Sequence, residues 1–253
     1  MIEKAGESAR HHRRFIVRTY ESDYSGRLRP ASLLNYFQEA AGEHAEELGA
    51  GIVELMKQNL TWVISRYHIK IFRYPRWKSP VDLTTWPCGH QGLFALREFE
   101  LKDEKGRLLA AATSSWMLLD VKTKKPVPPA ERLGPYPKDP RRAVASTFEP
   151  LPALERADLE RTFSVRMSDL DWNRHVNHVV YISWALETGS PDFLEKHRPA
   201  EIEVEFRGEA FYGDTVTSRM QTLISGPASH IGYAIIKEDG RKELARLRIL
   251  WQE

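Results

Sequence analysis

Residues 163–166 read Phe-Ser-Val-Arg and residues 15–18 read Phe-Ile-Val-Arg, so the same strand-like start occurs twice in this chain. The offset of 148 residues also places Asp171 on Asp23. In both copies a short polar loop follows the strand-like start, and a helix-like segment follows the loop. A match that keeps its spacing over such a distance indicates internal duplication. The remaining segments are therefore compared between the first and the second copy.

Each copy contains a predicted helix after its polar loop. Residues 31–48 carry apolar side chains at three- and four-residue intervals, which indicates a helix with one buried face. Pro30 suits its first turn, because the N–H that proline lacks would have no helical partner there. In the second copy we expect a helix over residues 177–187, with Asn177 as a favourable N-cap residue.

Antiparallel strands are predicted after each helix. Residues 65–71 and 202–206 alternate apolar with charged side chains, which is the period of a strand with one buried face. Further strands are predicted at residues 81–86, 94–102 and 108–121 in the first copy, and at 214–224, 230–237 and 244–251 in the second. A run of such strands packs its apolar face on the helix, so the predicted fold class is α+β.

The segment between the two copies is rich in proline, with eight prolines in residues 126–153. Because proline cannot donate a sheet hydrogen bond, we expect an extended linker there and no strand. The predicted organisation is therefore a first module at residues 1–135, a linker at 136–160 and a second module at 161–253.

Composition and charge exclude several classes of protein. Thirty-seven Lys and Arg residues against 35 Asp and Glu residues give a net charge of +2, too balanced to predict nucleic-acid binding. The single cysteine, Cys88, allows neither an intrachain disulfide nor a thiolate metal cluster. No apolar run approaches the roughly 20 residues that cross a bilayer, and the N-terminus has no apolar stretch typical of a secretory signal. We expect a cytoplasmic protein with no membrane partner.

The densest polar cluster, residues 168–178, lies just before the second helix. Asp171, Asn173 and His175 occupy alternate positions, so in an extended segment an acid, an amide and an imidazole would share one side. A base within reach of water and donors for an oxygen are what hydrolysis of a carbonyl compound needs. The backbone N–H groups at the helix start, those of Val176, Asn177 and His178, lack helical partners and could receive an oxyanion.

Two other interpretations of this cluster exist, a calcium loop and a purely structural loop. A calcium loop would need glycine at its sixth position and glutamate at its twelfth, where this sequence has Arg174 and Val180, so that interpretation fails. A purely structural loop, in which the polar residues only cap turns, is the second alternative. The first copy carries Ser25 and Arg27 at the positions of Asn173 and His175, which favours one active and one inactive copy of a site.

Residues 169–187 read Asp-Leu-Asp-Trp-Asn-Arg-His-Val-Asn-His-Val-Val-Tyr-Ile-Ser-Trp-Ala-Leu-Glu. This run resembles the signature of acyl-acyl carrier protein (acyl-ACP) thioesterases, and the resemblance extends over about residues 13–251. It implies two tandem hot-dog modules, each a long helix wrapped by an antiparallel sheet. It also implies hydrolysis of acyl-ACP, which releases free fatty acid and ends chain elongation in type II fatty acid synthesis. Similar segments occur at residues 62–66, 73–77, 113–116 and 206–209.

The resemblance also implies a set of catalytic residues. In the family the aspartate, asparagine and histidine of the motif act with a glutamate from a later strand, and these correspond here to Asp171, Asn173, His175 and Glu209. Without the resemblance, the alternation of residues 203–209 places Glu209 on the polar face of a strand, where it would be interpreted as a solvated residue. A bulge or close backbone approach at Gly208 could re-aim its carboxylate. Plant members commonly have a cysteine where this chain has Ala210, so a cysteine nucleophile has no residue at that place, and Cys88 lies far off in a predicted loop at residues 86–92.

The mechanism expected from these residues is attack by water. Glu209, helped by His175, would activate the water, and Asn173 with the helix-start amides would hold the carbonyl oxygen. Asp171 would orient Asn173 and His175. No cofactor and no metal is implied.

The acyl chain would lie in the first copy, which lacks the full set of polar residues, with Phe37 and Ala41 of the helix near it. The expected partner is acyl carrier protein, and the expected assembly is a monomer or a homodimer. Three alternatives remain open: a hot-dog acyl-CoA thioesterase, a hydroxyacyl-thioester dehydratase, and an acyl-binding protein without catalysis.

Overall fold

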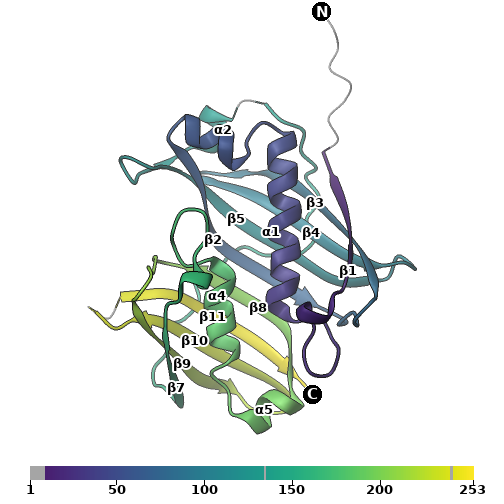
Figure 1. The fold of residues 1–253 in the computed structure, drawn as a ribbon, viewed down its shortest axis with the longest axis vertical. Helices are drawn as coiled ribbons and strands as arrows, with labels where there is room; N and C mark the ends of the chain where they lie inside the picture. Colours follow the sequence, from purple (N-terminus) through teal and green to yellow (C-terminus); the bar gives the residue numbers. More distant parts are fainter. Residues whose placement is uncertain (1–8, 134, 240–241) are drawn as a thin grey trace, which may run out of the picture. The chain divides into compact units, whose positions relative to one another are not determined.

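The computed structural model describes residues 9–133, 135–239 and 242–253, and these form two compact units (Figure 1). The first unit contains residues up to Ser65 together with Ile71–Ser146, and the second contains Arg66–Lys70 together with Thr147–Glu253. The division after Ser146 falls within the segment that the sequence predicts as a linker.

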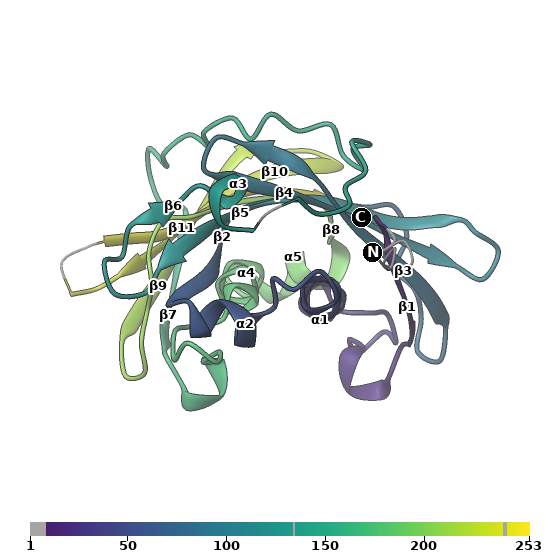
Figure 2. The same ribbon diagram turned by 90° about the horizontal axis from the view of Figure 1, so that it is seen from above.

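The first unit packs a long helix, α1 (Pro30–Glu47), against one side of an antiparallel sheet (Figures 1 and 2). Phe37 of α1 is fully buried and stacks on Phe99, with 4.8 Å between the ring centroids. Pro30 occupies the first turn of α1, as the sequence predicts. A short helix, α2 (Ile52–Lys57), follows. In the order in which they pair, the strands are β1 (His11–Ile16), β3 (Pro80–Gln91), β4 (Phe94–Asp103), β5 (Leu108–Asp120) and β2 (Leu60–Ile71).

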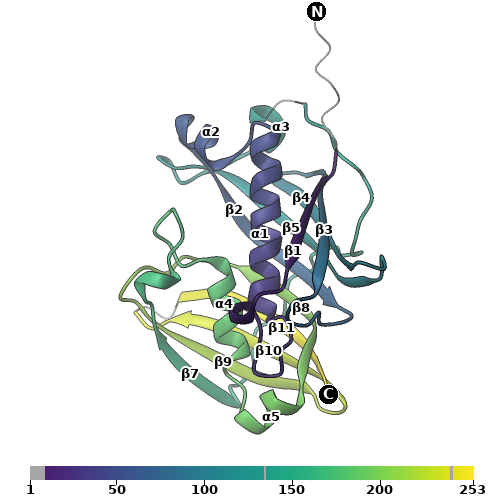
Figure 3. The same ribbon diagram turned by 45° about the vertical axis from the view of Figure 1, so that its right-hand side comes forward.

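The second unit repeats this arrangement with a shorter helix, α4 (His178–Leu186), along its own sheet (Figure 3). Asn177 caps α4, because its side-chain oxygen accepts a hydrogen bond of 2.9 Å from the amide of Val179. A short helix, α5 (Pro191–Lys196), follows. Residues 66–70 of β2 pair with β8 (Arg198–Phe206), and the sheet continues through β11 (Lys242–Gln252), β10 (Ala228–Lys237), β9 (Thr215–Ile224) and β7 (Leu159–Ser164).

The predicted α+β class is confirmed, since each unit packs a helix on an antiparallel sheet. The helices predicted at residues 31–48 and 177–187 match α1 and α4 to within a residue at each end. Several strands are longer than predicted, because pairing with a neighbour continues past the alternating apolar core. No helix among the described residues is long and apolar enough to cross a membrane.

Two predictions about local structure were wrong. Cys88 was expected in a loop but lies within β3, where the pairing register with β4 shifts between Pro87 and Gly89. The proline-rich segment at residues 126–153 was expected to contain no strand, yet Pro126–Val127 form a two-residue strand, β6, on the edge of β5. An edge position tolerates proline, because its missing N–H faces no partner strand. A single turn of helix, α3 (Pro129–Arg132), follows β6.

The linker is attached to both units by buried side chains. In the first unit, Arg142 donates a 2.9 Å hydrogen bond from Nε to the fully buried carboxylate of Glu98. In the second, Arg246 donates a 2.7 Å hydrogen bond from Nη1 to the carbonyl of Leu151. These bonds satisfy charged groups that would be costly to bury alone, and they fix the course of the linker within each unit.

Candidate active site

The candidate active site lies in the second unit, where the loop before α4 meets the segment after β8. Nδ1 of His175 lies 3.3 Å from Oε1 of Glu209. The two side chains are 24% and 41% exposed, so water and a substrate can reach both. The structure thus brings together the histidine of the motif and the later glutamate.

Glu209 reaches this position because the chain leaves the sheet just before it. The amides of Arg207 and Gly208 both donate to the carbonyl of Leu244, over 2.8 and 3.1 Å, so the regular strand pairing ends here. A Cβ atom at Gly208 would lie 2.9 Å from Cε of Lys242 and 3.2 Å from Cδ2 of Leu244. The backbone of Gly208 thus lies close to two side chains, and Glu209 follows the end of β8 with its side chain 41% exposed.

The next residue, Ala210, is fully buried. Its carbonyl accepts a 2.9 Å hydrogen bond from the amide of Val176, which joins the segment after β8 to the loop before α4. The methyl group of Ala210 has no nucleophilic atom.

The loop that carries the motif is a tight turn, and the prediction of an extended segment was wrong. The amide of Asp171 donates to the carbonyl of His175 over 2.8 Å, and Arg174 has a positive φ of 60°. Oδ1 of Asp171 accepts hydrogen bonds from the amides of Asn173 and His175, over 2.8 and 3.3 Å. Asp171 therefore fixes the backbone that carries the amide and the imidazole.

The first copy forms the same turn without the same polar side chains. Oδ1 of Asp23 accepts hydrogen bonds from the amides of Ser25 and Arg27, over 2.8 and 3.0 Å. Gly26, with φ of 75°, stands where the second copy has Arg174. The loop conformation and its aspartate thus belong to the repeat, whereas the asparagine and the histidine belong to the second copy alone.

Two of the predicted oxyanion donors are already used within the protein. The amide of Val176 donates to Ala210, and the amide of Asn177 donates to the carbonyl of Asp169 over 2.8 Å. The expectation that these two amides receive an oxyanion is corrected accordingly. The side-chain amide of Asn173 makes no hydrogen bond with another described residue, and its NH₂ group is a donor of the required kind.

Sequence reasoning missed one aromatic contact of this site. The ring of Phe211 meets the ring of His175 edge-on, with 5.0 Å between centroids and an interplanar angle of 90°. Nζ of Lys237 lies 5.8 Å from the centroid of Phe211. Phe211 thus packs against the imidazole, and its place two residues after Glu209 was the available signal.

His178 begins α4 with its ring among aromatic side chains. The ring stacks on Tyr67 at 6.2 Å and meets Phe206 edge-on at 5.8 Å. Burial lowers the pKa of His178 from 6.5 to about 4, so this imidazole is neutral at physiological pH.

This lowered pKa predicts a loss of stability in mild acid. Between pH 6.5 and 4 the unfolded chain binds a proton at His178 that the folded chain does not bind. The free energy of unfolding should therefore decrease as the pH is lowered through this window, and His178 should account for up to about 3 kcal/mol of the decrease. Denaturant unfolding at pH 7 and pH 4.5 measures the loss, and His178→Phe, which keeps a ring in place, should show a smaller one. Equal losses in the two proteins would contradict the prediction.

The remaining predicted substrate contacts, Phe37 and Ala41, lie on α1 in the first unit. Ala41 is 8% exposed, and its neighbour Ala40 is fully buried, so small side chains occupy part of this helix face.

The second unit also contains a cluster of possible metal ligands and a cavity. His68, Glu201 and Glu203 cluster within reach of one cation, but Lys70 lies 3.6 Å from Glu201, and Arg248 donates to Glu203 over 2.6 Å. Basic side chains thus already neutralise both carboxylates, and the cluster is a set of cross-strand ion pairs.

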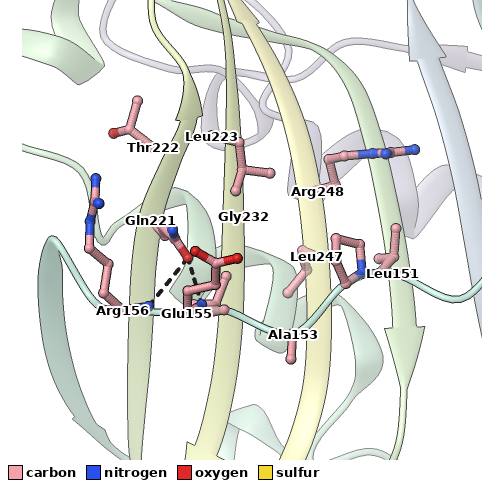
Figure 4. A pocket seen from close by; sticks show the side chains of 12 residues that line it. Leu151, Ala153, Glu155, Arg156, Gln221, Thr222, Leu223, Gly232, Leu247 and Arg248 are labelled. Carbon is pink, nitrogen blue, oxygen red and sulfur yellow. Dashed lines mark hydrogen bonds between the residues drawn. The ribbon is translucent and has the colours of Figure 1, made fainter.

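A cavity of about 420 Å³ lies between the linker and strands β9, β10 and β11 (Figure 4). The side-chain oxygen of Gln221 accepts hydrogen bonds from the amides of Glu155 and Arg156 there, over 2.9 and 3.5 Å. The described residues that line it include none of the predicted site residues.

Known proteins match this chain over both units. The acyl-ACP thioesterase N-terminal domain family matches residues 8–132, and the acyl-ACP thioesterase C-terminal domain family matches residues 153–253. The chain is 31% identical to the chloroplastic oleoyl-acyl carrier protein thioesterase of Coriandrum sativum, over 94% of this chain and 72% of that protein. It is 26% identical to the chloroplastic dodecanoyl-[acyl-carrier-protein] hydrolase of Cinnamomum camphora, over 95% of this chain and 67% of that protein.

A solved structure shows the same fold. The 12:0-ACP thioesterase from Umbellularia californica matches with a TM-score of 0.87 and 26% identity, over 96% of this chain and 94% of that chain. Together with the helix and sheet of each unit, this likeness confirms the predicted fold of two tandem hot-dog modules.

Proposed function

Because this chain belongs to the acyl-ACP thioesterase family, we propose that it hydrolyses the thioester of acyl-ACP and releases free fatty acid. The observation that carries the proposal is the 3.3 Å contact between Nδ1 of His175 and Oε1 of Glu209. It occurs in the copy of the repeat that has both Asn173 and His175. A thioester hydrolase needs such a base beside a solvent-accessible position.

The proposed reaction begins with water beside the His175–Glu209 pair. As the water oxygen attacks the thioester carbonyl carbon, the pair takes up the proton that the water loses. The side-chain amide of Asn173 donates a hydrogen bond to the carbonyl oxygen, where negative charge develops. The carbon–sulfur bond then breaks, and the proton held by the pair goes to the leaving thiolate. The products are a fatty acid and the free thiol of the carrier.

Asp171 has a supporting role in this scheme. Its carboxylate accepts the amides of Asn173 and His175, so it sets the positions of the two side chains through the backbone.

Release of free thiol from acyl-ACP, followed with a chromogenic thiol reagent, tests the function. A panel of chain lengths on acyl carrier protein, with the matching acyl-CoA series beside it, gives the substrate class. The proposal expects faster release from acyl-ACP than from acyl-CoA. A dehydratase would change a hydroxyacyl thioester without releasing thiol, and an acyl-binding protein would release none from any substrate. Either result would reject the proposal.

We also propose that the acyl chain is bound in the first unit, beside the face of α1 that carries Phe37 and Ala41. These residues are buried, whereas Glu39 on the same helix is exposed. Each methylene that a pocket buries contributes about 0.8 kcal/mol, so the depth of the pocket sets the preferred chain length.

Ala41→Trp is expected to shift the products toward shorter fatty acids, because the larger ring would fill the deep part of such a pocket. The measurement is the distribution of released acids from a mixture of acyl-ACP chain lengths. Glu39→Trp is the matched control, since it adds the same ring to the exposed side of α1. An unchanged distribution with Ala41→Trp in a folded protein would place the chain elsewhere.

The proposed partner is acyl carrier protein, and no role for nucleic acid or a membrane is proposed. The cytoplasmic location and the monomeric or homodimeric assembly remain predictions from the sequence.

A further inference from the structure

The peptide groups around Ala210 are held from two sides inside the second unit. The hydroxyl oxygen of Tyr181, on α4, accepts a 3.0 Å hydrogen bond from the amide of Ala210. The carbonyl of Ala210 accepts a 2.9 Å hydrogen bond from the amide of Val176. Tyr181 is 3% exposed and Ala210 fully buried, so water does not compete readily for either bond.

These two hydrogen bonds hold the peptide groups that follow Glu209 and His175. The amide of Ala210 belongs to the peptide group that joins it to Glu209, and the amide of Val176 belongs to the peptide group that joins it to His175. One bond therefore fixes the backbone of the glutamate, and the other ties the backbone of the histidine to the same short segment.

We propose that Tyr181 is a positioning residue for the hydrolysis, holding Glu209 against His175 through the amide of Ala210. This inference rests on the proposed function. It gives Tyr181 no contact with the substrate and no proton to transfer.

The first copy of the repeat supports the assignment, because it keeps one of the two bonds and lacks the other. The amide of Leu28, equivalent to Val176, donates to the carbonyl of Pro75 over 2.9 Å. Pro75 has no N–H to donate, and the position of Tyr181 is occupied by Leu33. Tyr74 precedes Pro75 where Glu209 precedes Ala210. The bond from the backbone amide to the tyrosine hydroxyl thus occurs in the copy that carries the histidine and the glutamate.

The hydroxyl group of Tyr181 is not needed for the packing of its ring. The ring of Tyr181 packs on Trp184 at 5.4 Å and on Phe206 at 6.1 Å, and a phenylalanine would keep both contacts. Burial raises the pKa of Tyr181, and the bond from the Ala210 amide opposes this shift while the charge of Glu209 adds to it. The phenol therefore stays protonated, and its oxygen remains an acceptor across the working pH range.

Tyr181→Phe is the decisive variant, with Tyr233→Phe as its matched control. Tyr233 is also fully buried in the second unit, and its hydroxyl accepts a 3.2 Å hydrogen bond from Nε1 of Trp251. Each change removes one hydroxyl from an interior site and leaves the ring. Circular dichroism and thermal unfolding establish that both variants are folded.

Tyr181→Phe is expected to lower kcat by about 10- to 100-fold, with KM changed by less than about threefold, because a small displacement of a reacting group is costly. Tyr233→Phe should keep kcat within about twofold, since an independent site does not couple to the pair. In a Glu209→Gln background, the further loss from Tyr181→Phe should fall to less than about threefold, because Tyr181 acts through that residue. Single-turnover assays with enzyme in excess keep the slow variants measurable.

Two results would overturn the inference while the proposed function stands: equal kcat values for Tyr181→Phe and Tyr233→Phe, or an undiminished effect of Tyr181→Phe in the Glu209→Gln background. A wild-type protein that releases no thiol from any acyl-ACP would overturn both.

Discussion

Replacing His175 by alanine is expected to lower kcat for acyl-ACP hydrolysis by about 10²- to 10⁴-fold, and Glu209→Gln should have an effect of similar size. The reason is that in the proposed mechanism these side chains, which lie 3.3 Å apart, act as one base. Because they act as a unit, the double variant should be little worse than either single one. Steady-state thiol release measures the rates. Both side chains are partly exposed, so the unfolding midpoint should change little.

Cys88→Ser is the control for this prediction, since Cys88 carries the chain's one thiol. Its Sγ lies in β3 and donates to Oε1 of Glu98 over 3.3 Å, a bond that serine can also make. Burial, followed by the charge of Glu98, raises the pKa of Cys88 to about 12, so the thiolate that could attack is not formed at neutral pH. The variant should keep nearly all activity. A hundredfold loss would point to a cysteine route instead of water attack.

The second large effect is expected at the aspartate that both copies share. Asp171→Ala should lower kcat by about 100-fold, because the turn that carries Asn173 and His175 loses the acceptor for two amides. Asp23→Ala removes the same acceptor from the first copy. Both variants should lose about 1–3 kcal/mol of stability, but only the former should lose most of its activity through displaced site residues. Denaturant unfolding measures the stability of the two variants, and thiol release measures their activity.

Asp171→Asn separates the two possible roles of this side chain. An asparagine oxygen can accept the same two amides, so this variant should keep activity within about tenfold of the wild type. A loss as large as that of Asp171→Ala would show that the negative charge itself takes part in the reaction. Such a result would return Asp171 to the reacting group, where the sequence resemblance first placed it.

The amino-acid sequence by itself determined the duplication, the two helices and the motif that distinguishes the copies. These features depend on local rules. Apolar spacing defines the buried face of α1, Asn177 caps α4 by accepting from the amide of Val179, and Asp171 closes a turn within four residues. His175 stood out because the first copy has Arg27 in the same place.

Only the tertiary structure decided how the distant parts meet. Glu209 approaches His175 because the strand pairing ends at Gly208 and because Val176 and Tyr181 hold Ala210. Those bonds join residues that lie far apart in the chain, so no local pattern encodes them.

The same long-range bonds engage the amide of Val176, which the sequence offered as an oxyanion donor. Local spacing specifies which groups are present, whereas backbone hydrogen bonds between distant segments determine which of them remain available for chemistry.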